Sequence, residues 1–181
     1  MTDLSDNELL NIYHQGNKNY SFNLLVKKYQ KKLYWHIRKI LISHDDTDDV
    51  LQNTFIKAWN ALPKFREESN LYTWLYRIAT NESLTYLNRN KLRNHLRIDG
   101  PDEILINKLE SDPHFNGDEI QKRLQKAILG LPEKQRLVFN MKYYDEMKYE
   151  DMSEILDTSV GALKASYHHA VKKIEKFFEG D

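Results

Sequence analysis

Residues 70–81, NLYTWLYRIATN, decide between a strand and a helix, because three aromatic residues alternate at their start. Such alternation is typical of a half-buried strand. The residues that follow have the apolar spacing of a helix, in which each residue turns by about 100°. Tyr72 and Tyr76 then share one side, and Trp74 points almost the opposite way. We therefore predict a helix with one face in a core and a second face that has another role.

Helical periodicity continues along most of the chain, and Val and Ile do not cluster in alternating runs. We predict helices at residues 4–13, 21–41, 46–62, 71–93, 119–129, 133–143, 149–156 and 160–178. Ser5 and Glu8 have the spacing of a capping box. Gly130 stands where a helix often ends with a left-handed residue, and Pro132 suits the start of the next helix.

A change of composition separates these helices into two groups. Residues 98–118, IDGPDEILINKLESDPHFNGD, are strongly acidic and contain the turn signals Gly-Pro and Asp-Pro. We interpret them as a linker with at most one short helix. The predicted fold is all-α, with two small helical domains at residues 1–95 and 119–181 joined by an acidic linker at residues 96–118.

The composition limits the class of protein. With 181 residues, 40% of them hydrophobic and 30% charged, the chain is ordinary for a folded domain pair. It has neither the roughly 18 consecutive apolar residues of a membrane span nor the basic and apolar start of a signal peptide. The absence of cysteine excludes disulfides and thiolate zinc sites. We expect a cytoplasmic protein.

The formal net charge of +0 hides a segregated distribution. Residues 9–44 contain no acid and seven lysines or arginines, and residues 83–98 again contain bases without acids. The acids gather at residues 45–49 and in the linker. Local basic surfaces of this kind keep nucleic acid among the possible partners.

The acidic run at residues 43–59, SHDDTDDVLQNTFIKAW, suggests either a metal or catalytic site or a helix N-terminus stabilised by its dipole. A catalytic reading needs a partner base in a concave site, and the sequence identifies none. We expect no catalytic residue, no metal and no cofactor here. The same helix can dock a partner through Asp49, Gln52, Phe55 and Trp59, although core packing competes for the two aromatics.

Residues 149–178, YEDMSEILDTSVGALKASYHHAVKKIEKFF, have the pattern of a helix-turn-helix. Ser159 is a suitable N-cap for its second helix, and Gly161 lets that helix approach a surface closely. Lys164, His168 and Lys172 lie on the outer face, suited to a DNA major groove. An amphipathic hairpin with solvated lysines is the alternative. A metal site at the two adjacent histidines is disfavoured, because neighbours on a helix diverge by about 100°.

The outer stripe of the helix at 71–93 combines an aromatic ring, a cation and an amide in Trp74, Arg77 and Asn81. Phe65 and Arg66 stand in the loop before it. Stacking rings, amides that read base edges and cations for phosphate are what single-strand recognition requires. Alternatively, Trp74 packs under the loop at 63–70 and Asn81 only caps a neighbouring group.

Three stretches together resemble an RNA polymerase sigma factor of the extracytoplasmic-function (ECF) subgroup. They are DDVLQNTFIKAWNAL, FREESNLYTWLYRIATNESLTYL and LPEKQRLVFNMKYYDEMKYEDMSEILDTSVGALKASYHHA. The resemblance implies a protein without catalytic activity that binds the polymerase core, recognises the −35 and −10 promoter elements and promotes DNA melting. It also implies contacts with the β′ clamp helices and the β flap, an anti-sigma partner, and no small-molecule substrate.

The resemblance also assigns residues to each contact. It implies −10 DNA contacts by Lys57, Phe65, Arg66, Trp74, Arg77 and Asn81; −35 DNA contacts by Ser159, Gly161, Lys164, His168 and Lys172; and core-polymerase contacts by Asp48, Asp49, Gln52 and Phe55. Sigma region 2 corresponds to the first domain and region 4 to the second.

Two departures from the family pattern concern the second domain. The recognition helix has Ala162, Ala165, Ser166, Tyr167 and His169 where common members read SVGTVKSRLHRA, and Asp157 replaces the usual turn glycine. The first departure alters the expected −35 preference, and the second suits a residue type that tolerates a left-handed conformation. The alternative function is a polymerase-independent helix-turn-helix regulator, which would need no single-strand stripe. An enzyme acting through the acidic run is a third reading.

Overall fold

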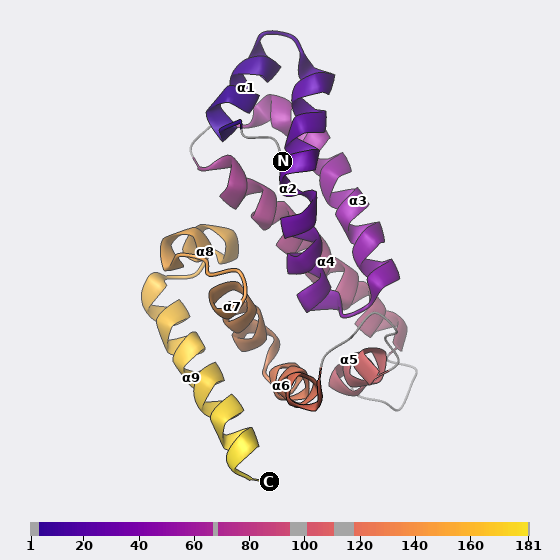
Figure 1. Ribbon diagram of the computed structural model, residues 1–181, viewed down its shortest axis with the longest axis vertical. Helices are drawn as coiled ribbons and strands as arrows, with labels where there is room; N and C mark the ends of the chain where they lie inside the picture. The colour runs from indigo at the N-terminus through magenta and orange to yellow at the C-terminus, as the bar shows by residue number, and fades with distance from the viewer. Residues whose placement is uncertain (1–3, 67–68, 95–100, 111–117, 181) are drawn as a thin grey trace.

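The computed structural model describes residues 4–66, 69–94, 101–110 and 118–180. Every regular element in these residues is helical (Figure 1). The elements are α1 (Asp6–His14), α2 (Lys18–Leu41), α3 (His44–Ala61), the 3-10 turn η1 (Leu62–Lys64), α4 (Leu71–Asn94), α5 (Pro101–Glu110), α6 (Glu119–Leu129), α7 (Glu133–Tyr143), α8 (Tyr149–Leu156) and α9 (Val160–Glu179). In this part of the chain no helix is long and apolar enough to cross a membrane.

The first four helices form a bundle in which α2 packs against α1, α3 and α4 (Figure 1). The helical steps of α2 place Leu25, Leu33 and Ile37 along one side, and all three are almost fully buried. Leu75 and Ala79 of α4 meet them from the facing helix and are fully buried as well. The predicted helices of this half are confirmed, each to within three residues at either end.

The last four helices form a second group, with α9 packed along α7 and contacted by α6 and α8. Its own core contains Ile128, Phe139, Ala170 and Ile174. The ring of Phe139 stacks on Tyr167 of α9 with their centroids 5.8 Å apart. This small core holds the long C-terminal helix in place.

Local capping follows the sequence with two exceptions. Ser5 and Glu8 form the predicted capping box, and Asp157 ends α8 in the left-handed conformation, with φ 49°. The prediction that Gly130 is left-handed is wrong. Its φ is −74°, and the chain continues in an α-like turn into Leu131. Pro132 precedes α7 as its N-cap, one position before the expected one.

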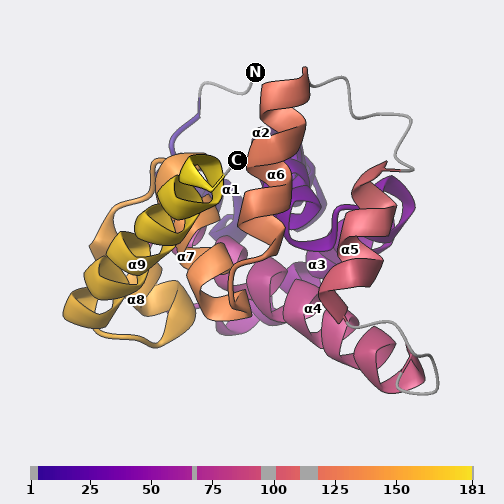
Figure 2. The ribbon, with the colours of Figure 1, turned by 90° about the horizontal axis from the view of Figure 1, so that it is seen from below.

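In the described part of the linker there is one helix, α5, which agrees with the prediction of at most one short helix. Leu105 and Leu109 of α5 are buried, and Figure 2 shows α5 beside α6 and close to the ends of α3 and α4. Glu110 of α5 binds Lys126 of α6, with 2.7 Å between the carboxylate oxygen and the ammonium nitrogen. Linker residues 96–100 and 111–117 lie outside the described residues.

The two groups of helices are docked against each other. α8 packs on α4, and α7 packs on α2. One continuous hydrophobic cluster includes Leu75 of the first group together with Met141, Met152 and Ile155 of the second. The sequence gives no sign of this docking, because the apolar residues involved also fit each domain's own core.

A polar cluster joins the two groups of helices. Asp145, in the turn after α7, accepts a hydrogen bond from Nδ1 of His36 at 3.0 Å and binds the ammonium of Lys39. Nε2 of His36 lies 2.8 Å from Oγ1 of Thr80, so α2, α4 and the second domain meet at one imidazole. The side chains of His36 and Asp145 are 1% and 8% exposed. Asn140 donates a further hydrogen bond to the carbonyl oxygen of Lys39 at 3.3 Å.

The cluster fixes the charge of Asp145. Burial alone would raise the pKa of this carboxyl, but the hydrogen bond and charge of His36 and the charge of Lys39 outweigh burial and hold the pKa below its ordinary value. Asp145 is therefore ionised at neutral pH. Burial also raises the pKa of the neighbouring Tyr72 to about 12, so that its hydroxyl remains protonated.

Candidate nucleic-acid interface

Helix α4 has the two faces that the sequence predicts. Tyr76 and Ser83 are buried toward α2 and α3, whereas Arg77 and Asn81 are exposed. Trp74 is half-buried at the start of the exposed face. The helix therefore presents an aromatic ring, a cation and an amide on successive turns, as single-strand recognition requires.

The residues before α4 bring a second ring to this face. After η1, the backbone N–H of Phe65 donates to the carbonyl oxygen of Leu62 at 3.1 Å and fixes the direction of the loop. The Phe65 and Trp74 rings then lie with centroids 5.0 Å apart and planes tilted by 45°. Trp74 is thus partly covered by the loop, as the packing alternative proposes, yet both rings keep partial exposure. Arg66 is exposed next to them.

Lys57 lies across the helix pair from this stripe. It projects from α3, is exposed, and binds the carboxylate of Glu82 on α4. The six residues predicted for −10 contacts thus come from α3, the loop after η1 and α4.

The residues predicted for polymerase contacts follow one side of α3. Asp48, Asp49 and Gln52 are exposed, and Phe55 is half-buried one turn further on. The Phe55 ring meets Phe22 of α2 edge-on at 6.4 Å between centroids. A carboxylate oxygen of Asp48 lies 3.5 Å from Nε2 of His44.

The acids at the start of α3 behave as helix-terminal residues. Ser43 caps α3 by accepting from the backbone N–H of Asp46, and Asp46 accepts from the hydroxyl of Tyr86 at 2.5 Å. Within the described residues, no three His, Asp or Glu side chains are grouped so that they could hold a metal ion.

Helices α8 and α9 form a helix-turn-helix. Ser159 caps α9 by accepting from the backbone N–H of Ala162 at 3.3 Å. Leu163 is buried on the inner side, while Lys164, His168 and Lys172 are exposed on the outer side. A Cβ added at Gly161 would meet nothing within 4 Å, so the first turn is open toward an incoming surface.

Removing the cap of α9 tests how its first turn is held. We expect Ser159→Ala to lower the free energy of unfolding by about 1 kcal/mol, because a helix-terminal N–H loses its partner. Thermal and denaturant unfolding of the full chain measure this change. Ser166→Ala in the middle of α9 is the control, and it should be neutral or slightly stabilising because alanine favours a helix interior. An equal loss in both variants would contradict a capping role.

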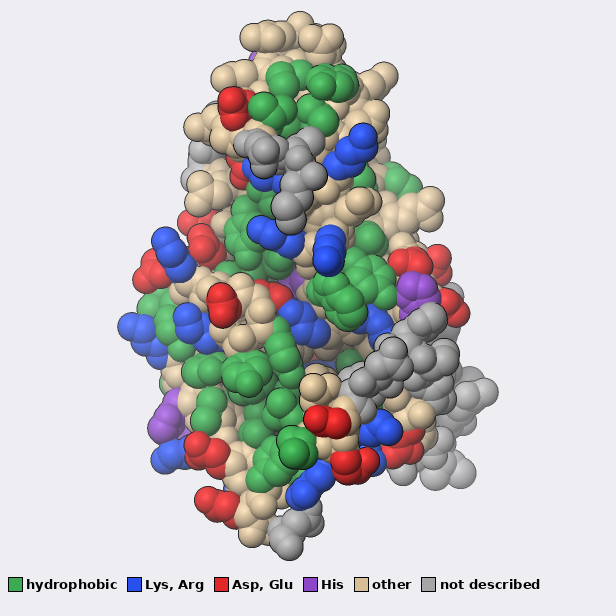
Figure 3. Space-filling view, in the orientation of Figure 1, with side chains coloured by type: hydrophobic (Ala, Val, Ile, Leu, Met, Phe, Trp, Pro, Cys, Tyr) green, Lys and Arg blue, Asp and Glu red, His purple; other side chains and the backbone are tan. Residues whose placement is uncertain are grey.

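Sequence reasoning missed two features of the site. The first is Glu82, whose only signal is that it is the single acid between residues 69 and 98. The second is a cleft between the docked domains, with basic residues from α2 on one side and Tyr144 on the other. Lys27, Lys31, Lys32 and the exposed Trp35 line it, and Figure 3 shows basic side chains around apolar surface there. The acid-free composition of α2 was visible, but its cleft depends on docking.

Comparison with known proteins places both halves in known families. Residues 25–93 match Sigma-70 region 2, and residues 121–174 match Sigma-70, region 4. The ECF RNA polymerase sigma-E factor of Haemophilus influenzae is 32% identical over 190 residues, which cover 95% of this chain and 94% of that protein. The RNA polymerase sigma-H factor of Pseudomonas aeruginosa is 31% identical and covers 97% of this chain and 95% of its own length.

Solved structures share the fold. CnrH, solved in complex with the cytosolic domain of CnrY, has a TM-score of 0.68 at 23% identity, covering 97% of this chain and 98% of that one. The sigma factor RpoE of Bartonella quintana, solved with the anti-sigma factor NepR, has a TM-score of 0.68 at 20% identity, covering 88% of this chain and 98% of that one. Two region matches in order, and relatives similar over nearly the whole length, lead to one conclusion. The chain belongs to the ECF group of RNA polymerase sigma factors.

Proposed function

We propose that this protein binds RNA polymerase core, recognises the −35 and −10 promoter elements and promotes strand separation for transcription initiation. The observation that carries the proposal is the stripe on α4 of the half-buried Trp74 and the exposed Arg77 and Asn81, in one chain with a helix-turn-helix. A duplex-binding regulator would need only the second of these two elements. The polymerase-independent regulator is therefore not favoured.

In this proposal each domain binds both polymerase core and one promoter element. Residues 1–95 bind core and the −10 element, residues 119–181 bind the −35 element, and residues 96–118 connect them. Asp48, Asp49, Gln52 and Phe55 on α3 contact the β′ clamp helices, and the second domain contacts the β flap. The outer face of α9, with Lys164, His168 and Lys172, enters the major groove of the −35 element.

The −10 step converts binding energy into strand separation. Extruding a base costs a few kcal/mol, and stacking on Trp74 or Phe65, an amide contact from Asn81 and phosphate contacts from Arg66 and Arg77 offset this cost. No bond is made or broken by this chain, because the polymerase supplies the active site. The protein acts in the cytoplasm, and an anti-sigma factor holds it inactive by covering these surfaces.

Run-off transcription tests the proposal. Purified core polymerase, with and without this protein, is given fragments of the host genome that include the region upstream of its own gene. A transcript from a defined start that requires the protein supports the sigma-factor function. Duplex binding without core association and without transcript would support the plain regulator instead.

Asn81→Ala locates the melting site in the same assay. We expect a fall of roughly 5- to 150-fold in promoter-specific transcript, since an amide contact to a base edge contributes about 1–3 kcal/mol. Asn11→Ala, at an exposed helical position on α1, is the matched control and should transcribe as the wild type does. Unchanged transcription by Asn81→Ala would assign Asn81 a purely structural role.

A further inference from the structure

Glu82 occupies an unusual place on the −10 face. It follows Asn81 directly on α4, and it binds the ammonium of Lys57 from α3. The Lys57 side chain is 59% exposed, whereas the Glu82 side chain is only 15% exposed. The carboxylate is thus fixed at the edge of a basic surface, and the lysine reaches to it from the neighbouring helix.

The pair has little value as a structural clamp. Ion pairs with a solvated partner add little to stability, because solvent screens them and the long side chain loses freedom. α3 and α4 are already joined by Val50, Ala58 and Ala79, all of which are buried in the common core. We therefore look for the effect of the Lys57–Glu82 pair on the surface beside it and not on stability.

On that surface Glu82 opposes the neighbouring charges. Lys57 is the exposed cation beside Glu82, and Glu82 is the single acid between residues 69 and 98. A DNA phosphate that approaches Lys57 has to displace the carboxylate or share the ammonium with it. It also meets the negative charge of Glu82 itself.

We propose that Glu82 is a positioning residue that restrains Lys57 and weakens the grip of the −10 face on the DNA backbone. The proposal rests on the proposed function and adds a determinant of its strength. Because phosphate contacts carry no sequence information, the restraint acts equally on matched and mismatched promoters. Base recognition by Asn81 and Trp74 then provides a larger share of the remaining affinity.

Glu82→Gln tests the proposal in reconstituted holoenzyme. Binding to the promoter found by run-off mapping is measured by fluorescence anisotropy over a range of KCl concentrations. We expect binding about 5- to 30-fold tighter at the lowest salt, and a plot of log K against log salt that is steeper by about one, as one released lysine predicts. A promoter with a scrambled −10 element should gain by the same factor.

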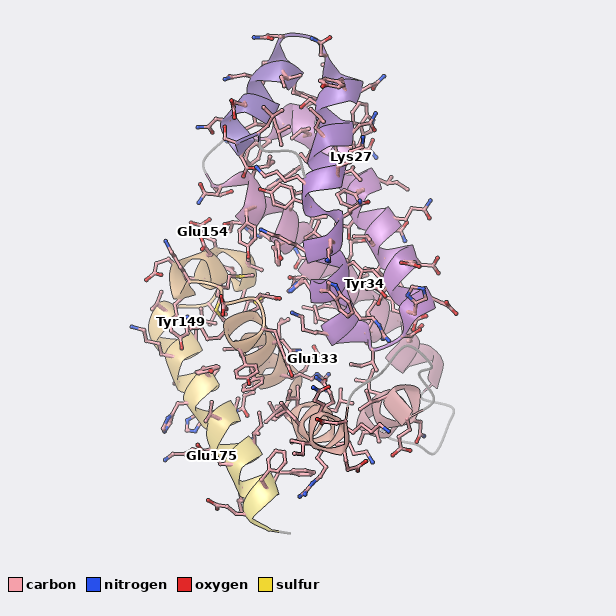
Figure 4. All side chains as sticks on the ribbon, viewed as in Figure 1. Lys27, Tyr34, Glu133, Tyr149, Glu154 and Glu175 are labelled. Carbon is pink, nitrogen blue, oxygen red and sulfur yellow. The ribbon has the colours of Figure 1, made fainter. Side chains whose placement is uncertain are left out.

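Further variants distinguish the restraint that Glu82 places on Lys57 from the effect of the negative charge of Glu82. Glu82→Asp keeps the charge but shortens the reach, so the salt slope should steepen as in Glu82→Gln with a smaller gain in affinity. Lys57→Gln combined with Glu82→Gln should lose the steeper salt slope and the part of the gain that the released lysine supplies. Glu154→Gln, which removes one exposed charge from α8 (Figure 4), is the control and should bind as the wild type does. Thermal unfolding of each variant checks the fold.

The results distinguish a failure of the Glu82 proposal from a failure of the proposed function. An unchanged or weaker Glu82→Gln, a gain confined to the matched promoter, or a steeper salt slope that survives in the double variant would each overturn the role of Glu82. Wild-type holoenzyme that binds no promoter would overturn the proposed function, and the role of Glu82 with it.

Discussion

Asp145→Ala is expected to release the second domain from the first. The substitution leaves His36 buried without its acceptor and Lys39 without its counter-ion. Removing one member of a buried ion pair generally costs about 3–5 kcal/mol. Even the lower value shifts the equilibrium between docked and separated domains by roughly 150-fold.

Fluorescence energy transfer measures the separation directly. The chain contains no cysteine, so Asn11→Cys and Glu175→Cys give two exposed labelling sites, one in each domain. We expect high transfer in the wild-type background and a clear loss in Asp145→Ala. Glu154→Ala, an exposed acid on α8, is the control and should keep the wild-type transfer. Undiminished transfer in Asp145→Ala would mean that apolar packing alone holds the domains together.

The same contact predicts an acid dependence. The pKa of Asp145 lies below its ordinary value in the docked state. Its contribution to docking is therefore complete above the ordinary aspartate pKa of about 3.9 and is lost as the pH falls through the lowered value. Asp145 stays ionised over this range, so its contribution should keep the energy-transfer signal of the wild type constant from neutral pH down to about pH 5.

Trp74→Ala is expected to abolish most promoter opening. Stacking of a base on an aromatic ring contributes about 1–3 kcal/mol by alanine substitution, equal to roughly 5- to 150-fold in the population of melted DNA. Permanganate reactivity of thymines in the −10 region measures that population in reconstituted holoenzyme. Core association should remain, because the predicted core contacts lie on α3.

Trp35→Ala is the matched control for this experiment. Trp35 is 53% exposed on α2 and lies in the cleft between the domains, away from the exposed stripe of α4. Its loss should leave promoter opening unchanged. If Trp74→Ala opened the promoter as well as the wild type does, the ring would serve only to pack against Phe65.

Local features of this molecule could be predicted from the sequence. Helix positions, the Ser5 capping box, the Ser159 cap and the opposite faces of Tyr76 and Asn81 depend on residues a few positions apart, and all are confirmed. Gly130 was mispredicted because glycine permits a left-handed turn without requiring one. The roles of the −10, −35 and core-contact residues remain predictions.

Contacts between distant residues could not be predicted. Asp145 and His36 are far apart in the sequence, and neither shows by its neighbours that it is buried. Lys57 and Glu82 meet only because α3 and α4 pack in one register. Such pairs arise from tertiary packing, which a single sequence does not encode as a periodic pattern.

The docked domains set a threshold for reaching DNA. Elements centred near −35 and −10 are about 25 base pairs apart, which is roughly 85 Å at about 3.4 Å per base pair. In the docked molecule α8 lies on α4 and α9 follows α8 directly, so the two faces proposed to bind DNA are too close to span that length. If docking contributes about 3 kcal/mol, under about 1% of free molecules are extended, and promoter affinity falls by the same factor. Polymerase core, by holding the domains apart, would restore that affinity, so that the free protein stays off promoters until it meets the enzyme.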